Sequence, residues 1–384
     1  MAEFNYLYRQ FVLRTLRVLY QGYARLTGRK FRCKTLTGEA ILGCYVNSDM
    51  TVSCNCQDVD GTGQLGNLRL SAFEEIFTGE KTMRLRRQLA RGRLPLNRCA
   101  ACFSLEITRG ETAENDLSGF RLPRGVCVEN TILCNLRCLS CCRQMVMKTR
   151  GQRHCLSLDD VDVIARTLQR LGATFCGFYN LGEPFYSPRI RGELEILRKY
   201  NPQMEIFIST NGILIDNDDK MAAALLTDHI IFSIDGVSTE MVQRYQRGGN
   251  FEKAYKNLKA LVSLRDSMGR EKPIIGWKYV VFRWNDKPDY IRALIKLAEA
   301  AGIDYIEITF ARTPWHGFSW RFFSPFYRSL AKREGRSRII WLRKPGSDSI
   351  ADSIESAKHD ADQNRSEFGL TAGLAEERAE AAPR

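Results

Sequence analysis

Between about residues 124 and 310, strand-like and helix-like segments alternate, and this alternation most constrains the fold of the 384-residue chain. Six strands are expected, at 125–133, 173–180, 204–210, 229–234, 274–282 and 303–310. Helices are expected between them, for example 158–171 after the capping residue Ser157 and 287–301 before Gly302. Alternating β and α segments with short connections are typical of a parallel sheet. Six β-α units predict an α/β fold, an open (β/α)6 partial TIM-type barrel with its chemistry at the carboxyl ends of the strands.

The remaining chain divides into four regions of different composition. They are a basic amphipathic helix (1–32), a cysteine-containing module (33–123), a basic aromatic segment (311–345) and a polar tail (346–384). Within the module we expect short strands at 43–54 and a helical stretch at 71–91. The N-terminal helix is expected to pack on the barrel, and the composition of the tail predicts disorder.

The chain has 13 cysteines, all at or before Cys176, and a formal net charge of +13. It lacks the long apolar run of a membrane span and a secretory signal, so we expect a cytoplasmic protein. Clustered cysteines in a reducing compartment are more often metal ligands or catalytic groups than disulfides. The charge favours an anionic partner, and the two basic aromatic flanks would suit the inner face of a membrane. A nucleic-acid partner is disfavoured, because these flanks match a nucleic-acid groove only in composition.

Three cysteines lie on one loop directly after the first barrel strand. Cys134, Cys138 and Cys141 are separated by three and then two residues. Three thiolates on such a loop can hold three irons of a [4Fe-4S] cluster and leave the fourth iron open for a ligand. The alternative is a structural zinc loop, whose fourth ligand would be Cys142, Cys155 or His154.

The next three barrel strands each end in a glycine-containing polar motif. These motifs are Asn-Leu-Gly-Glu-Pro at 180–184, Ser-Thr-Asn-Gly at 209–212 and Ser-Ile-Asp-Gly at 233–236. Each alone is an ordinary turn sequence. Because carboxyl ends of parallel strands share one edge, the three motifs together predict a ligand site above the barrel.

With these motifs, residues 124–310 resemble the radical S-adenosylmethionine (SAM) superfamily. The resemblance implies that Cys134, Cys138 and Cys141 ligate a [4Fe-4S] cluster whose open iron binds SAM. It further implies a SAM-binding set comprising Gly182, Glu183, Pro184, Ser209, Asn211 and Asp235. Arg247 is a candidate partner for the SAM carboxylate, because a guanidinium engages both oxygens. The family usually has an aromatic residue before the third cysteine, at the adenine; Ser140 stands there in this chain.

The module at 33–123 resembles a SPASM domain, an auxiliary iron-sulfur module that normally follows the barrel and here precedes it. The expected ligands of one auxiliary [4Fe-4S] cluster are Cys99, Cys102 and two of Cys44, Cys54 and Cys56. A zinc ribbon is the alternative for these cysteine pairs. Cys33, Cys127 and Cys155 have no evident partner, and Cys176 is a weak candidate for donating a hydrogen atom to a product radical.

The family resemblance implies reductive cleavage of SAM to a 5′-deoxyadenosyl radical, which abstracts a substrate hydrogen atom. We expect oxidation or epimerisation of a carbohydrate or small metabolite, with peptide maturation as the alternative. An electron donor such as flavodoxin or ferredoxin is implied. A zinc-stabilised protein that binds nucleic acid or a membrane is the alternative outside this class.

Overall fold

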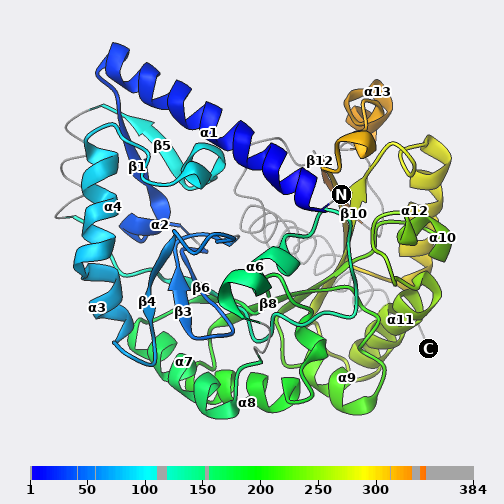
Figure 1. Ribbon diagram of the computed structural model, residues 1–384. Coiled ribbons are helices and arrows are strands. Elements are labelled where there is room, and N and C mark those ends of the chain that lie inside the picture. Colours follow the sequence, from blue (N-terminus) through cyan, green and yellow to red (C-terminus); the bar gives the residue numbers. More distant parts are fainter. Residues whose placement is uncertain are drawn as a thin grey trace, which may run out of the picture. The chain divides into compact units, whose positions relative to one another are not determined.

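The computed structural model describes residues 2–40, 42–56, 58–109, 119–151, 155–311, 313–330 and 338–342 (Figure 1). The predicted tail at 346–384 and part of the basic aromatic segment lie outside these residues. The described chain has a mixed α/β fold built on one large sheet.

The six expected strands lie side by side and parallel, in the order of the sequence. They are β6 (Gly125–Val128), β7 (Phe175–Gly177), β8 (Glu205–Thr210), β9 (His229–Ser233), β10 (Ile274–Val281) and β11 (Tyr305–Phe310). Two further parallel strands extend this sheet. Strand β2 (Cys44–Val46) falls within the strand region expected at 43–54 and lies beside β6, and β12 (Arg338–Leu342), which we did not predict, lies beside β11. Antiparallel β3 (Thr51–Ser53) and β4 (Gln64–Asn67) follow β2, so part of the N-terminal module continues the barrel sheet.

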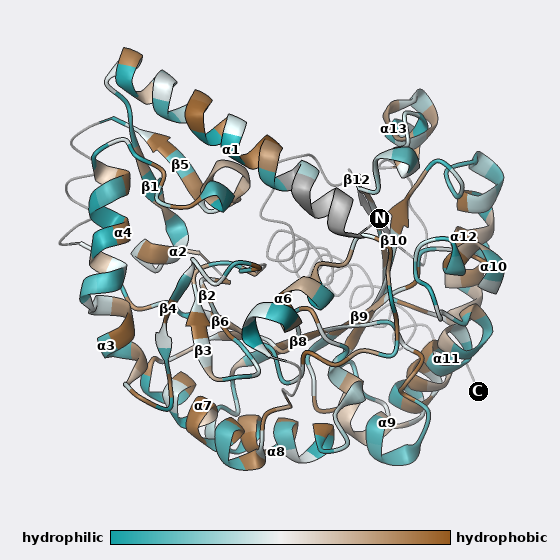
Figure 2. Ribbon diagram, in the orientation of Figure 1, coloured by the Kyte–Doolittle hydropathy of each residue, from teal (hydrophilic) through white to brown (hydrophobic). Residues whose placement is uncertain are grey.

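Helices lie around the outside of the strands in Figure 1. The longer ones are α7 (Leu158–Arg170), α8 (Ile190–Tyr200), α9 (Asp218–Ala224), α11 (Phe251–Ser267) and α12 (Pro288–Ala301). The Ser157 hydroxyl accepts the Asp160 N–H at 3.1 Å and caps α7, and Gly302 ends α12 at a φ of 68°. Both ends agree with the sequence. These helices carry teal and brown faces in Figure 2, as expected when one face packs on a sheet.

Alternate strand residues point to opposite faces, and the two faces differ in chemistry. Ile206 and Ile208 of β8 belong to the hydrophobic core, which also includes side chains of α8 and α11. The opposite face carries a ladder of rings, in which neighbours contact one another across the strands: Tyr179, Phe207, His229 and Tyr305. The helices therefore pack against the face that carries Ile206 and Ile208, and the face that carries the rings lines the inside of the barrel.

The N-terminal elements form a second cluster. They are α1 (Ala2–Thr27), β1 (Lys30–Cys33), α2 (Lys34–Thr37), α3 (Phe73–Thr78), α4 (Glu80–Ala90), the 3-10 turn η1 (Asn97–Ala101) and β5 (Leu105–Thr108), which pairs antiparallel with β1. Helix α1 packs on η1, and Arg17 Nε donates to the Leu94 carbonyl at 2.9 Å. The expected helix at 71–91 is two helices, because Gly79 adopts extended backbone between them.

The basic aromatic segment packs partly against the loop after β10. It contains η3 (Trp315–Gly317), η4 (Arg321–Phe323) and α13 (Pro325–Leu330). The Ser319 hydroxyl donates to the Asp286 carboxylate at 2.8 Å, whereas Trp315 and Trp320 remain 69% and 77% exposed. No helix among the described residues is long and apolar enough to cross a membrane.

Candidate active site

The loop that carries Cys134, Cys138 and Cys141 follows β6 and ends at α6 (Arg143–Arg150). Backbone hydrogen bonds fix it to the segment after α10 (Thr239–Gln243): Arg137 N–H donates to the Arg247 carbonyl and Leu139 N–H to the Tyr245 carbonyl, both at 3.0 Å. The Leu136 N–H donates to Cys134 Sγ at 3.3 Å. A loop held at several points presents its three thiols in a fixed arrangement.

The three thiols lie close enough to influence one another. Burial raises the pKa of Cys138 well above its usual value, and the neighbouring Cys141 and Cys134 raise it further. Burial also raises the pKa of Cys134 to about 11, which the Arg143 guanidinium opposes. A bound metal would reverse these shifts, because metal-bound thiols are thiolates. Three neighbouring thiols on one fixed loop are a donor set that fits three irons of an iron-sulfur cluster.

Arg143 is a site residue that sequence analysis missed. Its guanidinium is buried and donates to two carbonyls of the cysteine loop, those of Ile132 at 3.4 Å and Leu136 at 3.2 Å. Beside the third cysteine, the Ser140 hydroxyl is buried and has no hydrogen-bond partner within the described structure. A polar atom of a bound ligand would satisfy this hydroxyl, so the position fits a ligand next to the cysteines.

The second motif packs directly against the cysteine loop. A Cβ atom added at Gly182 would lie 1.9 Å from the Thr131 carbonyl oxygen, closer than any real contact. The next N–H, of Glu183, donates to the Leu133 carbonyl at 2.8 Å. Glycine is required at position 182 because two backbones meet there.

The Gly182→Ala variant is expected to lower SAM affinity or turnover by about 100-fold, because the methyl group displaces one ligand-binding loop from the other by an ångström or more. The matched control is Gly192→Ala in α8, where the added Cβ would make an ordinary 3.4 Å contact with the Leu158 side chain. Equilibrium binding of SAM under anaerobic conditions measures the effect. Equal affinity in the two variants would contradict the tight packing at Gly182.

The Glu183 carboxylate connects the ends of two strands. It accepts the Thr210 hydroxyl at 2.6 Å and the Asn211 N–H at 2.7 Å. Burial raises its pKa to about 7, although these hydrogen bonds favour the ionised form. Asn211 in turn donates its side-chain amide to Asn135 in the cysteine loop at 2.8 Å. The structure thus gathers Gly182, Glu183 and Asn211 around the cysteines, with Pro184 opening the turn η2 (Pro184–Tyr186).

The other predicted binding residues lie along the same edge. Asp235 is buried, its pKa is raised to about 7 by burial, and its charge contributes to the raised pKa of Cys138. The Ser209 and Ser233 hydroxyls are 3.3 Å apart on neighbouring strands. Arg247 braces the cysteine loop through its carbonyl, and its side chain is exposed. Its guanidinium can therefore still turn toward a carboxylate.

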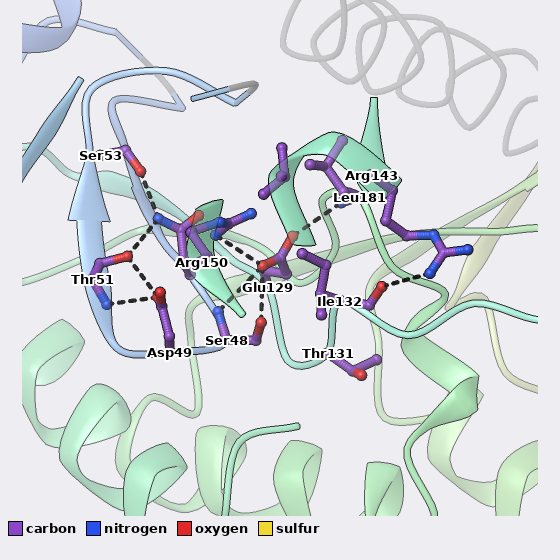
Figure 3. Close-up of polar contacts among 12 residues, drawn as sticks. Ser48, Asp49, Thr51, Ser53, Glu129, Thr131, Ile132, Arg143, Arg150 and Leu181 are labelled. Atoms are coloured by element: carbon purple, nitrogen blue, oxygen red, sulfur yellow. Dashed lines mark hydrogen bonds and ion pairs between the residues drawn. The ribbon is translucent and has the colours of Figure 1, made fainter. Parts of the chain in front are cut away.

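A buried carboxylate that sequence analysis did not identify joins the N-terminal module to the site. Glu129 follows β6 and lies at the centre of the network in Figure 3. It accepts the Ser48 hydroxyl at 3.0 Å, Arg150 Nη1 at 3.2 Å and the Leu181 N–H at 3.3 Å. These partners come from the turn between β2 and β3, from α6 and from the loop of Gly182. Glu129 therefore connects the N-terminal module to helix α6 and to the Gly182 loop.

The Glu129→Gln variant is expected to lose about 3 kcal/mol of folding free energy, because it removes the buried negative charge that pairs with the nearly buried Arg150. Denaturant unfolding measures this loss. The matched control is Glu39→Gln, which removes an ion pair of Arg32 where the carboxylate is 46% exposed, and which should cost less than about 1 kcal/mol. Similar losses in both variants would show that the Glu129 network is no stronger than a surface pair.

A second group of thiols surrounds a hollow in the N-terminal module. Four cysteines line it: Cys33, Cys54, Cys99 and Cys102. The hollow has an empty volume of about 410 Å³, and apolar residues such as Leu85, Leu89 and Leu96 form much of its wall. We call this site the four-cysteine hollow. Burial raises the pKa of Cys54 well above its usual value, with further increases from Cys33 and Cys99.

This set differs from the one expected from the sequence. Cys44 lies in β2, fully buried in the hydrophobic core, and the nearby Arg86 opposes the burial that raises its pKa to about 12. Cys56 is not among the residues that line the hollow, although its charge influences the pKa of Cys102. Cys33, for which we expected no partner, lines the hollow together with Cys54, Cys99 and Cys102.

The sequence also left open a structural zinc site among the cysteines and a role for Cys176 as a hydrogen-atom donor. Within the described chain, no three His, Cys, Asp or Glu side chains converge tightly enough to hold one metal ion. A cluster needs a wider arrangement, because each thiolate binds a different iron. Cys176 belongs to the hydrophobic core, and burial raises its pKa to about 12. His154, a possible fourth zinc ligand, lies outside the described residues.

Residues 130–268 match the family described as the radical SAM superfamily. The match covers the cysteine loop and all three polar motifs, so the family's [4Fe-4S] cluster and SAM are the cofactors implied for the site.

Two curated relatives are similar to part of the chain. GTP 3′,8-cyclase of Peptoclostridium acidaminophilum is 28% identical over 131 residues, which cover 34% of this chain and 40% of that protein. The tungsten-containing aldehyde ferredoxin oxidoreductase cofactor-modifying protein of Pyrococcus furiosus is 32% identical over 183 residues, 44% of this chain and 48% of that protein. The chain thus spans less than half the length of the curated relatives it matches.

Solved structures of radical SAM proteins are also similar. SuiB of Streptococcus suis bound to S-adenosylmethionine matches with a TM-score of 0.46 and 15% identity, over 60% of this chain and 55% of that chain. The same protein bound to the precursor peptide SuiA matches with a TM-score of 0.42 and 13% identity, over 86% of this chain and 69% of that chain.

Proposed function

We propose that the chain is a radical SAM enzyme that holds a [4Fe-4S] cluster with Cys134, Cys138 and Cys141 and cleaves SAM reductively. The observation that carries the proposal is the convergence of the cysteine loop with the Gly182 loop and Asn211 at one edge of the sheet. When bound, the cluster and SAM supply a 5′-deoxyadenosyl radical for hydrogen-atom abstraction. The chain supplies the fixed thiols, the ligand-binding loops and a site shielded from water.

We assign the positioning of SAM to the three strand-end motifs. The Glu183 carboxylate is occupied by Thr210 and Asn211, so it shapes the Gly182 loop, whose backbone would meet the amino group. Arg247 has an exposed guanidinium suited to the carboxylate of SAM. Ser209 would lie near the carboxylate or ribose of SAM, and Asp235 would complete the binding set. The orphan Ser140 hydroxyl is a partner for a polar atom of SAM in place of the family's aromatic contact.

For the substrate we propose a small polar molecule that enters the barrel. Beside Ser233 in the strand register lie Lys278 and then Glu307, whose Nζ and Oε1 atoms are 3.7 Å apart. That Glu307 oxygen is buried and accepts no hydrogen bond within the described structure. Hydroxyl and charged groups on the inner face suit a sugar or a charged metabolite. The names of both curated relatives also concern small molecules, a nucleotide and a cofactor.

We also propose that the four-cysteine hollow holds an auxiliary [4Fe-4S] cluster. Four thiols line one hollow, and most of the other lining residues are apolar. Four protein ligands would leave no iron open. Such a site suits electron transfer or structural support rather than substrate binding.

Anaerobic reconstitution followed by chemical reduction tests the proposed function. The full chain should bind about eight irons and release 5′-deoxyadenosine from SAM. Zinc in place of iron, with no release, would overturn the proposal and support the zinc-stabilised binding protein.

A further inference from the structure

A strongly basic hollow lies between α1 and α4, apart from the barrel. It is lined by Arg17, Gln21, Arg84, Arg87, Gln88, Arg91, Arg93 and Leu94, and its empty volume is about 770 Å³. We call it the arginine hollow. The sequence from Lys81 to Arg98 contains seven basic residues and no aspartate or glutamate. The charge of the hollow is therefore a property of this segment rather than of the whole surface.

Among the described residues, most of the guanidinium groups in the arginine hollow have no anionic partner. Arg87 is the exception, because its Nη2 atom lies 2.7 Å from both carboxylate oxygens of Glu80. Arg17 is held by neutral groups, the Leu94 carbonyl and Asn97 Oδ1 at 3.0 Å. Within the described structure, Arg84, Arg91 and Arg93 make no ion pair. The hollow thus offers about four uncompensated positive charges.

Only one helix separates the arginine hollow from the four-cysteine hollow. Leu85 and Leu89 of α4 line the four-cysteine hollow, while Arg84 and Gln88 of the same helix line the arginine hollow. Arg17 also binds Asn97, two residues from Cys99.

The lining of the arginine hollow favours a protein partner over a small ligand. Pockets for small ligands are mostly apolar and enclose the ligand, whereas Leu94 is the one apolar residue that lines this hollow. Arg84, Arg91 and Arg93 are exposed. Exposed arginines at the rim suit the carboxylates of an acidic protein surface, and they speed the encounter of oppositely charged proteins.

We infer that the arginine hollow docks an acidic one-electron carrier protein, which exchanges an electron with the group held by Cys33, Cys54, Cys99 and Cys102. The inference rests on the proposed auxiliary cluster. In each exchange the reduced carrier loses one electron and the auxiliary cluster gains it, with no bond made or broken and no proton transferred. The reverse transfer would remove an electron that the cluster has accepted from a substrate radical.

The test uses the reconstituted full chain and reduced flavodoxin as the acidic carrier. Arg91→Glu/Arg93→Glu reverses the charge in the arginine hollow, and Arg14→Glu/Arg25→Glu is the matched control at exposed positions of α1 outside it. Stopped-flow reduction at low salt should slow at least tenfold in the first variant and change less than about twofold in the control. A higher salt concentration should lower the reduction rate of the wild type and leave that of Arg91→Glu/Arg93→Glu nearly unchanged. The cationic radical of methyl viologen should reduce all three proteins similarly.

Two further measurements separate this inference from the function on which it rests. Calorimetric titration with flavodoxin reports docking without any reaction, and iron content reports the auxiliary cluster. If the full chain binds about four irons and flavodoxin still docks, the auxiliary cluster is absent, and electron exchange at this site is overturned. About eight irons, with flavodoxin affinity and rate unchanged in Arg91→Glu/Arg93→Glu, would overturn the docking surface alone. Tight binding of inorganic pyrophosphate, without competition by flavodoxin, would assign the hollow to a phosphorylated ligand instead.

Discussion

The variant in which Cys134, Cys138 and Cys141 are all alanine is expected to release no measurable 5′-deoxyadenosine from SAM and to bind about four fewer irons than the wild type. Alanine offers no ligand to iron, and the open coordination site for SAM exists only while three thiolates hold the cluster. Iron analysis and chromatography of the assay products measure the two losses together. No other change proposed for this chain should have a larger effect on SAM cleavage.

The control for this prediction lies in the same loop. Cys142 directly follows Cys141 but is buried at the start of α6. The Cys142→Ala variant should keep its iron and its SAM cleavage, because this side chain is turned into the protein. Cleavage that survives the triple substitution would mean that the reacting group is bound elsewhere. Loss of cleavage in Cys142→Ala alone would mean that packing of the loop, rather than ligation, accounts for the effect.

The parts of the fold that the sequence predicts are those whose signals are local. Ser157 and Gly302 mark helix ends because the hydrogen bond of a cap and a positive φ act within a few residues. The barrel strands are recognisable because they are short apolar runs between such helices. Strand β12 was missed, and so was the pairing of β2 with the barrel sheet, because each strand joins the sheet only through a neighbour far away in the sequence, β2 beside β6 and β12 beside β11.

The same distinction separates the two cysteine sites. Cys134, Cys138 and Cys141 stand within eight residues, so their spacing already indicates a common ligand. Cys33 is far from the other thiols of the four-cysteine hollow in the sequence, and it reaches them through pairing of β1 with β5. In that register Cys33 lies opposite Leu105, three residues after Cys102. Spacing favoured Cys44 and Cys56 because it cannot show which strands pair.

Glu129 and Arg143 were missed for a different reason. Both are charged residues next to the cysteine loop, and in the sequence they look like ordinary solvated positions. Their function depends on burial, which places Glu129 among donors from three segments and Arg143 among carbonyls of the loop. The available signal for Glu129 was its position directly after a fully apolar strand, where a charged side chain is costly unless it is paired.

The Cys33→Ala variant is expected to bind about four irons per chain instead of about eight, whereas Cys44→Ala should keep about eight. Cys33 lines the four-cysteine hollow, and three remaining thiols would hold an auxiliary cluster weakly. Cys44 lies in the core beside β6, so its loss should cost about 1 kcal/mol of stability and no iron. Iron analysis, with electron paramagnetic resonance of the reduced proteins, measures the difference.

The opposite result is equally informative, because both candidate ligand sets contain Cys99 and Cys102, and the sequence leaves open which two of Cys44, Cys54 and Cys56 complete the set. If Cys44→Ala loses the iron and Cys33→Ala keeps it, the ligand set expected from sequence spacing is correct and the pairing of β1 with β5 does not bring a ligand. Cys56→Ala is the third arm, since Cys56 lies near Cys102 without lining the hollow. SAM cleavage reports separately on the barrel site in each variant. If Cys33→Ala loses four irons and still cleaves SAM, the protein has two independent clusters. One is bound by three cysteines that are close together in the sequence, and the ligands of the other are brought together by strand pairing.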